Sequence, residues 1–267
     1  MKLGIRKMRD EEYHAAEGLS NSYLWRLIDR TPAHAVTPFA ATDAMNLGSA
    51  VHIAVLQPEL AAEMIVQGPK DRRGKKWAEA KEEAEAGKKI LLTEADYGVA
   101  MKMRDRVWQN SVLAGLLTGK GVKYEQAAFW QHCEWLCKCK VDAAKDNFIL
   151  DLKTTADASP RGFAKSCASF GYHQQAASYR YGWGKASGKQ VDHFLFLCIE
   201  KSAPYLPAIY ELDAPSLSEG WASYIAAIDL HAQCEERKEF HGYAAEKVLL
   251  QLPPYAFKHT NPRHITL

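Results

Sequence analysis

The sequence predicts an α/β fold in which helices flank a central β-sheet. Short runs of β-prone apolar residues, of which 148–153 is the clearest, alternate with longer segments that carry helix-capping residues and helical spacing. In order, these segments predict N-terminal helices, three strands, a helix, two strands and a last helix. A chain of 267 residues with 47% hydrophobic content can bury a sizeable core, as one α/β domain or as two small ones.

Overall charge, cysteine content and hydropathy limit which classes of protein the chain can belong to. The formal net charge of +2 means that a nucleic-acid partner would be held by local basic patches rather than by the overall charge. The 6 cysteines show neither paired C-x-x-C spacing nor the density of a disulfide scaffold. No run approaches the roughly 18 apolar residues of a membrane span, and the N-terminus lacks the apolar core of a signal peptide. We therefore expect a reduced, cytoplasmic protein without membrane contact.

The first predicted helix begins at Ser20 or the next residue and ends before Thr31-Pro32, because the residue before a proline is pushed out of the helical region. The free N–H groups at its start could hold a phosphate, with Ser20, Ser22 and Arg26 as further donors. The same pattern also fits an ordinary capped helix that packs its leucines inward.

A second helix is predicted over residues 47–56, where small residues at 48–50 permit close packing against a sheet. His52 lies on this otherwise apolar helix and is either a satisfied core residue, which is the commoner case, or a ligand. The basic, glycine-broken segment 70–76 is either solvated surface or a loop that lies along a DNA backbone. Helices over 77–89 and from Thr93 to about residue 107 follow, and then a strand over 124–130 with Glu125 near its start.

A hairpin at residues 133–155 is the centre of the sequence argument. We expect strands over 135–142 and 148–153, joined by a polar turn at 143–147. Asp151 and Lys153 project to one face of the second strand, and Asp142 ends the first, so all three can converge. Charges on a largely buried strand are costly unless they are paired or hold a metal ion.

Two carboxylates and a lysine in this arrangement suit phosphate chemistry. Carboxylate oxygens are ligands for Mg²⁺ or Mn²⁺, and the lysine could orient or deprotonate a water or stabilise charge that develops on a phosphate. The pattern is Asp142, eight residues, then Asp151-x-Lys153. A bare D-x-K is common, and its simplest interpretation is an exposed salt-bridged strand.

The segments after the hairpin complete the predicted fold. A helix begins near residue 163 and is broken near Gly171; in its second part Gln175 and Tyr179 are four residues apart and share a face. Strands over 191–199 and 205–212 and a helix over 215–236 follow, and the last residues are expected to be irregular.

Together these motifs resemble the RecE-type exonucleases of the PD-(D/E)xK, RecB-like nuclease superfamily. The residues that carry the resemblance are Tyr13-His14, Leu19-Ser20-x-Ser22, Leu47-Gly48-x-Ala50-x-His52, Val55-Leu56-x-Pro58-Glu59, Cys137-x-Cys139-x-x-Asp142, Asp151-x-Lys153-Thr154-Thr155-Ala156-Asp157 and Tyr172-His173-x-Gln175-x-x-x-Tyr179. Val141 departs from the pattern, since the motif often has proline there. The resemblance spans roughly residues 11 to 212.

The resemblance implies a restriction-endonuclease-like core with a mixed sheet flanked by helices. It places the chain, residues 1–267, in a single nuclease domain with its core at about 44–238, an N-terminal helical unit at 11–43 and an irregular tail at 239–267. It makes His52, Asp142 and Asp151 metal ligands, Lys153 the catalytic lysine and Glu125 a further acidic residue of the site. The implied DNA-binding residues are Gln175, Tyr179, Ser20, Ser22 and Arg26.

The implied activity is a 5′→3′ exonuclease, dependent on Mg²⁺ or Mn²⁺ and using two ions, that degrades one strand of linear double-stranded DNA. It would leave 3′ single-stranded tails for a RecT-like annealing protein, act as a ring-shaped homo-oligomer and work in the cytoplasm of a bacterium or a phage-infected host. The alternatives are an endonuclease or single-strand-specific nuclease with the same ligands, and a non-enzymatic module that binds DNA ends. Cys133, Cys137 and Cys139 could indicate an iron–sulfur cluster, but their alternation along one strand favours plain packing.

Overall fold

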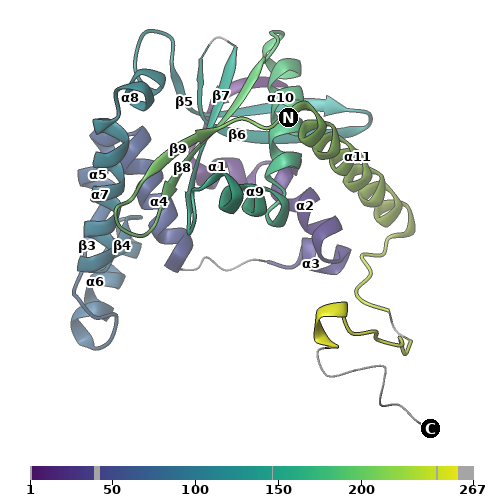
Figure 1. Ribbon diagram of the computed structural model, residues 1–267, viewed down its shortest axis with the longest axis horizontal. Coiled ribbons are helices and arrows are strands. Elements are labelled where there is room, and N and C mark those ends of the chain that lie inside the picture. The colour runs from purple at the N-terminus through teal and green to yellow at the C-terminus, as the bar shows by residue number, and fades with distance from the viewer. Residues whose placement is uncertain (1, 39–42, 146, 245, 258–267) are drawn as a thin grey trace.

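The computed structural model describes residues 2–38, 43–145, 147–244 and 246–257, and at its centre is a mixed β-sheet (Figure 1). Its strands are β1 (Gly4–Lys7), β2 (Leu19–Ser20), β5 (Lys123–His132), β6 (Trp135–Lys145), β7 (Phe148–Thr155), β8 (His193–Glu200) and β9 (Pro207–Tyr210). The strand order is β1-β5-β6-β7-β8-β9, with β2 paired to β6 beside that path. β7 pairs with β8 in parallel, and β6 is antiparallel to both β5 and β7. The predicted α/β class with a mixed central sheet is confirmed.

Helices cover both faces of the sheet. They are α1 (Asp10–Ala15), α2 (Asn21–Asp29), α3 (Pro32–Val36), α4 (Asp43–Leu56), α5 (Pro58–Met64), α6 (Lys75–Ala86), α7 (Glu94–Gln109), α8 (Ser111–Leu117), α9 (Pro160–Ser169), α10 (Tyr172–Ser187) and α11 (Ala214–Arg237). In Figure 1, α5, α7 and α8 lie together at the left, and α11 lies at the right. The two groups bury separate cores.

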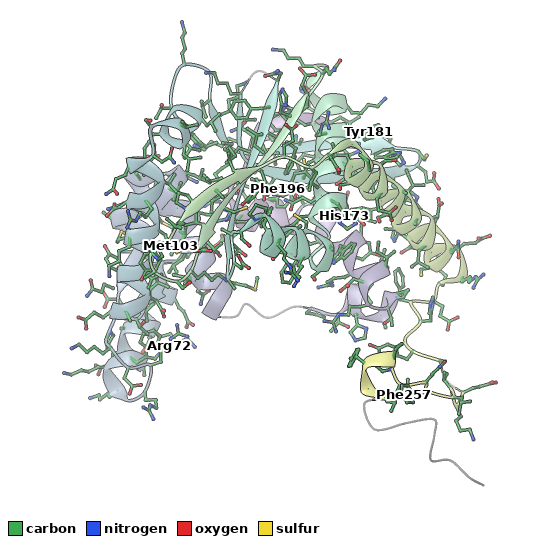
Figure 2. All side chains as sticks on the ribbon, viewed as in Figure 1. Arg72, Met103, His173, Tyr181, Phe196 and Phe257 are labelled. Carbon is green, nitrogen blue, oxygen red and sulfur yellow. The ribbon has the colours of Figure 1, made fainter. Side chains whose placement is uncertain are left out.

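Successive side chains of a strand point to opposite faces of the sheet, and this alternation produces the two cores. One core packs β6, β7 and β8 against α2, α9, α10 and α11, and the other packs β7 and β8 against α4, α7 and α8. Figure 2 marks one buried residue of each, Phe196 and Met103. Ile149 belongs to the first core, whereas Leu150 and Leu152 belong to the second, so β7 is covered on both faces.

Two predicted helix starts are found at their capping residues, whereas the helices predicted from 47 and from 77 begin at Asp43 and Lys75. The Ser20 side chain accepts a hydrogen bond from the backbone N–H of Tyr23, and Thr93 does the same for Asp96. The predicted break near Gly171 separates α9 from α10. Gly171 has φ +66°, and a Cβ there would overlap the ring of Trp25, so only glycine fits this turn.

Local pattern missed or misplaced several strands. The expected turn at 143–147 is wrong for its first part, because β6 continues to Lys145 and pairs Ala143 with Leu150. β1 and β2 also join the sheet, and β3 (Ile65–Gln67) pairs with β4 (Ile90–Leu92) as a small parallel sheet. These segments have two to four residues, which is too short for a periodic signal.

The chain after α11 is irregular as far as it is described. Its one helical turn is η1 (Pro254–Ala256), and its exposed apolar residues include Leu249 and Leu250. Residues 258–267, the end of the predicted tail, lie outside the described residues. Among the helices that the structure describes, none is both long and apolar enough to cross a membrane.

Candidate active site

The predicted site lies where β6 and β7 separate. Backbone pairing of the two strands runs from Lys145 and Phe148 to Ala143 and Leu150. One residue further along β6, Asp142 Oδ2 accepts a hydrogen bond from the backbone N–H of Leu152 at 2.7 Å. At this point the Asp142 side chain, rather than the backbone of β6, accepts the hydrogen bond from β7. The carboxylate therefore lies beside the middle of β7 and not at the turn of the hairpin.

Asp151 and Lys153 form a buried ion pair on β7. Lys153 Nζ is 2.6 Å from Asp151 Oδ2, and the Asp151 side chain is 6% exposed. The other carboxylate oxygen, Oδ1, accepts a hydrogen bond from Gln175 Nε2 on α10 at 2.6 Å. Gln175 therefore orients Asp151, and its predicted contact with DNA stays a prediction.

His52 joins the group from α4, on the other face of the sheet. Its Nδ1 is 3.4 Å from Asp142 Oδ2, across the gap between the strands. Burial lowers the pKa of His52, and this effect outweighs the nearby carboxylates, which favour the protonated form. A neutral imidazole beside a carboxylate is able to ligate a cation.

Glu125 is opposite Asp142 on β5. Its neighbours are paired, Tyr124 with Ala143 and Gln126 with Val141, but the pair between them is missing from the ladder. Glu125 has φ +53°, a left-handed conformation that is strained for a residue with a side chain. Its carboxylate forms an ion pair with Lys140 of β6. Glu125 therefore lies next to Asp142, and its role in the site stays a prediction.

Electrostatics at the site favour bound positive charge. Burial raises the pKa of Asp142 well above its usual range, and the charges of Asp151 and Glu125 raise it further. Burial opposes the charged form of Lys153, but Asp151 and, to a smaller extent, Tyr172 and Asp142 raise its pKa, so it stays protonated. Buried carboxylates that repel one another are stabilised by a cation between them.

The donor set fits a hard divalent cation. Carboxylate oxygens from Asp142 and Asp151 and the nitrogen of His52 are the available ligands, and oxygen donors suit Mg²⁺ and Mn²⁺. Among the described residues, no three or more His, Cys, Asp or Glu side chains are already gathered as a metal cluster. The carboxylates of Asp151 and Glu125 instead form ion pairs, Asp151 with Lys153 and Glu125 with Lys140.

Two side chains at the site had no predicted role. The ring of Tyr172, at the start of α10, lies 4.7 Å from Lys153 Nζ. Lys140 contacts Glu125. Side chains alternate along a strand, so the spacing of two residues between Lys140 and Asp142 could have predicted that these two side chains share a face of β6. No pattern in the sequence shows that Lys140 and Glu125 meet.

The other predicted DNA contacts differ in their surroundings. Burial raises the pKa of Tyr179, and nearby groups that include Asp151 and Asp142 raise it further, so Tyr179 lies near the carboxylates. Tyr179 is 9% exposed and packs edge-on against Phe194, so its predicted DNA contact stays a prediction. Ser20 caps α2, and Ser22 is exposed. Arg26 donates hydrogen bonds to backbone oxygens at the end of α3, Ala35 O and Thr37 O, and so does not point to the start of α2. The phosphate role of these three residues stays a prediction.

The basic segment 70–76 and the cysteines were further candidates. Lys70 and Arg73 form ion pairs with Glu94 and Asp71 within the chain. All 6 cysteines are free thiols, and Cys133 is the exposed one, while Cys137 and Cys139 are buried. Burial raises the pKa of Cys137 to about 11, and its Sγ accepts a hydrogen bond from the Tyr224 hydroxyl. The two buried thiols therefore pack as apolar groups, as the alternation predicts.

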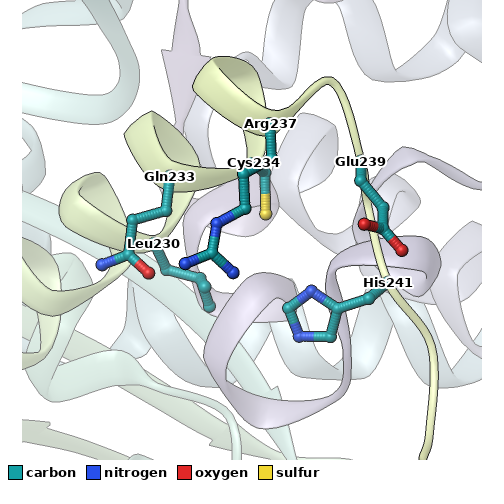
Figure 3. Close-up of a pocket in the computed structure, with 6 residues that line it drawn as sticks. All are labelled: Leu230, Gln233, Cys234, Arg237, Glu239 and His241. Carbon is teal, nitrogen blue, oxygen red and sulfur yellow. The ribbon is translucent and has the colours of Figure 1, made fainter.

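A cavity of about 270 Å³ lies at the end of α11, away from the carboxylates (Figure 3). It is lined by Leu230, Gln233, Cys234, Arg237, Glu239 and His241. None of these residues belongs to the predicted site, so the candidate chemistry is not located in this cavity.

Comparison with solved structures finds proteins of similar fold. No curated protein matches the chain. The fold is similar to that of a candidate exonuclease from Eubacterium rectale, with a TM-score of 0.66 and 14% identity over 93% of this chain and 96% of that one. A phage-related exonuclease from Haemophilus somnus 129PT is also similar, with a TM-score of 0.34 and 14% identity over 53% of this chain and 74% of that one.

The family match covers most of the chain. Residues 30–249 match the family described as a PDDEXK-like domain of unknown function, DUF3799. This match includes both strands of the hairpin and therefore Asp142, Asp151 and Lys153. It supports a nuclease, and PD-(D/E)xK nucleases typically use divalent metal ions. The chain belongs to this PDDEXK-like family and, through it, to the PD-(D/E)xK nuclease superfamily.

Proposed function

We propose that the chain is a metal-dependent exodeoxyribonuclease that degrades one strand of linear double-stranded DNA from 5′ to 3′. The observation that carries this proposal is the convergence of Asp142, Asp151 and Lys153 where β6 and β7 separate, with Gln175 bonded to Asp151. The exonuclease named for the similar fold supports the reaction class. The direction and the duplex substrate rest on the resemblance to RecE-type exonucleases.

Each side chain has a role that its position supports. Asp142 and Asp151, with His52 and Glu125, would hold one or two Mg²⁺ or Mn²⁺ ions. When bound, such ions activate a water and stabilise charge on the scissile phosphate. The protonated ammonium of Lys153 donates hydrogen bonds to the water or to developing negative charge, and Tyr172 confines its position. Gln175 holds the orientation of the Asp151 carboxylate through a hydrogen bond to Oδ1.

The biological setting follows from the same resemblance. We infer that the product is a 3′ single-stranded tail for a RecT-like annealing protein, that the enzyme works as a ring-shaped homo-oligomer, and that it acts in the cytoplasm of a bacterium or a phage-infected host. The proposed DNA contacts are Gln175, Tyr179 and the start of α2, with Ser20, Ser22 and Arg26. Because Arg26 already binds carbonyl oxygens, its contact with a phosphate requires that these bonds be exchanged.

Digestion of end-labelled DNA tests the proposal. With Mg²⁺, linear duplex should lose a 5′ label before a 3′ label, while circular duplex should survive, and chelator should stop the reaction. Cleavage of circular DNA would indicate an endonuclease instead, and digestion of single strands alone would indicate a single-strand-specific enzyme. Binding of DNA ends without cleavage at any metal concentration would overturn the enzymatic proposal in favour of an end-binding module.

A further inference from the structure

Lys140 is a buried cation beside the site that carries no assigned role. Its side chain is 11% exposed, and its Nζ contacts two carboxylates, Glu125 of β5 and Asp10 of α1. Burial lowers the pKa of Lys140, and the hydrogen bonds and charges of Asp10 and Glu125 together raise it by more. A fixed positive charge therefore lies two residues from Asp142 along β6.

This charge is bound to the acidic residue that faces Asp142. Glu125 stands opposite Asp142 in the register of β5 and β6, and its charge contributes to the raised pKa of Asp142. Its side chain is only 15% exposed, so solvent reaches little of its carboxylate. Without a cation in the site, Lys140 is the partner that neutralises it.

The neighbouring lysine on the same face shows that this contact is particular to Lys140. Lys138 donates hydrogen bonds to backbone oxygens of the α1 region, Tyr13 O at 2.9 Å and Ala16 O at 2.5 Å. It thus anchors the N-terminal segment to β6 without touching a carboxylate. Lys140 instead links two carboxylates, one of which belongs to the candidate site.

We propose that Lys140 is the resident counter-ion of the site: its ammonium holds Glu125 in the cation-free protein and competes with the divalent cation for that carboxylate. This inference rests on the proposed metal-dependent function. Lys140 is a positioning residue, since it acts through Glu125. Asp10 of α1 pairs with the same ammonium and so weakens the hold of Lys140 on Glu125. Loss of the ammonium should therefore tighten cation binding rather than weaken it.

Binding of Mn²⁺ to the DNA-free protein, followed by the electron paramagnetic resonance of free Mn²⁺, tests the competition. Lys140→Met should bind Mn²⁺ about tenfold more tightly than the wild type, because the Glu125 carboxylate is then free of the ammonium that competes with the ion for it. Lys140→Arg should bind like the wild type. Lys123→Met removes the same charge from an exposed position on β5 and should leave the affinity unchanged. Equal or weaker binding by Lys140→Met overturns the proposal.

A double-mutant cycle separates competition for Glu125 from a general field effect. In a Glu125→Gln background, the added substitution Lys140→Met should change Mn²⁺ affinity by less than about twofold, since the shared carboxylate is gone. An undiminished tenfold effect in that background would mean that Lys140 acts on the cation without Glu125, and the proposal would be wrong.

A third variant leaves the interior intact. Asp10 is exposed, and Asp10→Ala should weaken Mn²⁺ binding about two- to threefold, because Lys140 then pairs with Glu125 alone. Glu12→Ala removes the same charge from α1, where Glu12 pairs with Arg9, and should have no effect. Equal effects of the two variants would overturn the role of Asp10, and absence of Mn²⁺ binding by the wild type would instead refute the metal-dependent function.

Discussion

At the scale of single residues, Asp151 and Lys153 are placed for different tasks although they form one ion pair. Asp151 has one oxygen toward Lys153 and the other on Gln175, so its orientation is held by two partners. Lys153 lies against the ring of Tyr172 and remains protonated. A carboxylate held in this way is suited to ligate a cation, whereas an ammonium held in this way is suited to donate hydrogen bonds to negative charge.

We expect Asp151→Asn and Lys153→Ala each to reduce DNA cleavage by at least about a hundredfold with little change in fold, because each removes a charge that the reaction uses. Equilibrium binding of Mg²⁺ should separate the two variants: Asp151→Asn should weaken it strongly, and Lys153→Ala should not. Cleavage at the wild-type rate by either variant over a Mg²⁺ titration would contradict the assignment. Circular dichroism checks that each variant is folded.

At the scale of elements, α10 connects the site to the first core. Gln175 and Tyr179 lie on its buried side, and both of its ends are glycines in the left-handed region, Gly171 at φ +66° and Gly188 at φ +68°. The two glycines differ in their surroundings, since Trp25 closes the space at Gly171 and nothing lies near a Cβ at Gly188. Substituting each glycine by alanine therefore distinguishes the cost of backbone strain alone, at Gly188, from strain plus steric overlap, at Gly171.

Gly188→Ala should destabilise the protein by about 1–2 kcal/mol, the cost of a left-handed conformation for a residue with a Cβ. Gly171→Ala should cost about 1–3 kcal/mol more, because the ring of Trp25 must also move. Chemical unfolding measures both differences. Because α10 carries Gln175, Gly171→Ala should also lower cleavage more than Gly188→Ala does. If the two variants have equal stability, Trp25 does not restrict this turn.

At the scale of the whole molecule, the fold buries carboxylates close together, which costs free energy when they are ionised. Two layers of helices exclude solvent from β7, and the strands part at Asp142, so its carboxylate is buried near Asp151 and Glu125. A group whose pKa is raised on folding contributes stability below its unfolded pKa and loses it as the pH rises through its folded pKa. Asp142 therefore destabilises the cation-free protein toward neutral and alkaline pH.

Thermal unfolding in chelator between pH 5 and pH 8 should show this effect. Asp142→Asn keeps an oxygen for the N–H of Leu152 but lacks the charge, so its advantage in Tm over the wild type should grow as the pH rises. Mg²⁺ should raise the Tm of the wild type, by about 2–4 °C for each kcal/mol of binding, and should not raise that of the variant. A Tm difference that is independent of pH would show that Asp142 is not the responsible group.

The sequence by itself determined the class of fold, the strands that carry Asp142, Asp151 and Lys153, and the two helices whose N-caps are Ser20 and Thr93. These features are local, because alternation, capping and the cost of buried charge act within a few residues. Only the tertiary structure decided that β6 and β7 part at Asp142, that Arg26 binds α3, and that Lys140 joins Glu125 to Asp10. Those contacts join distant segments, and packing of the whole chain brings them together.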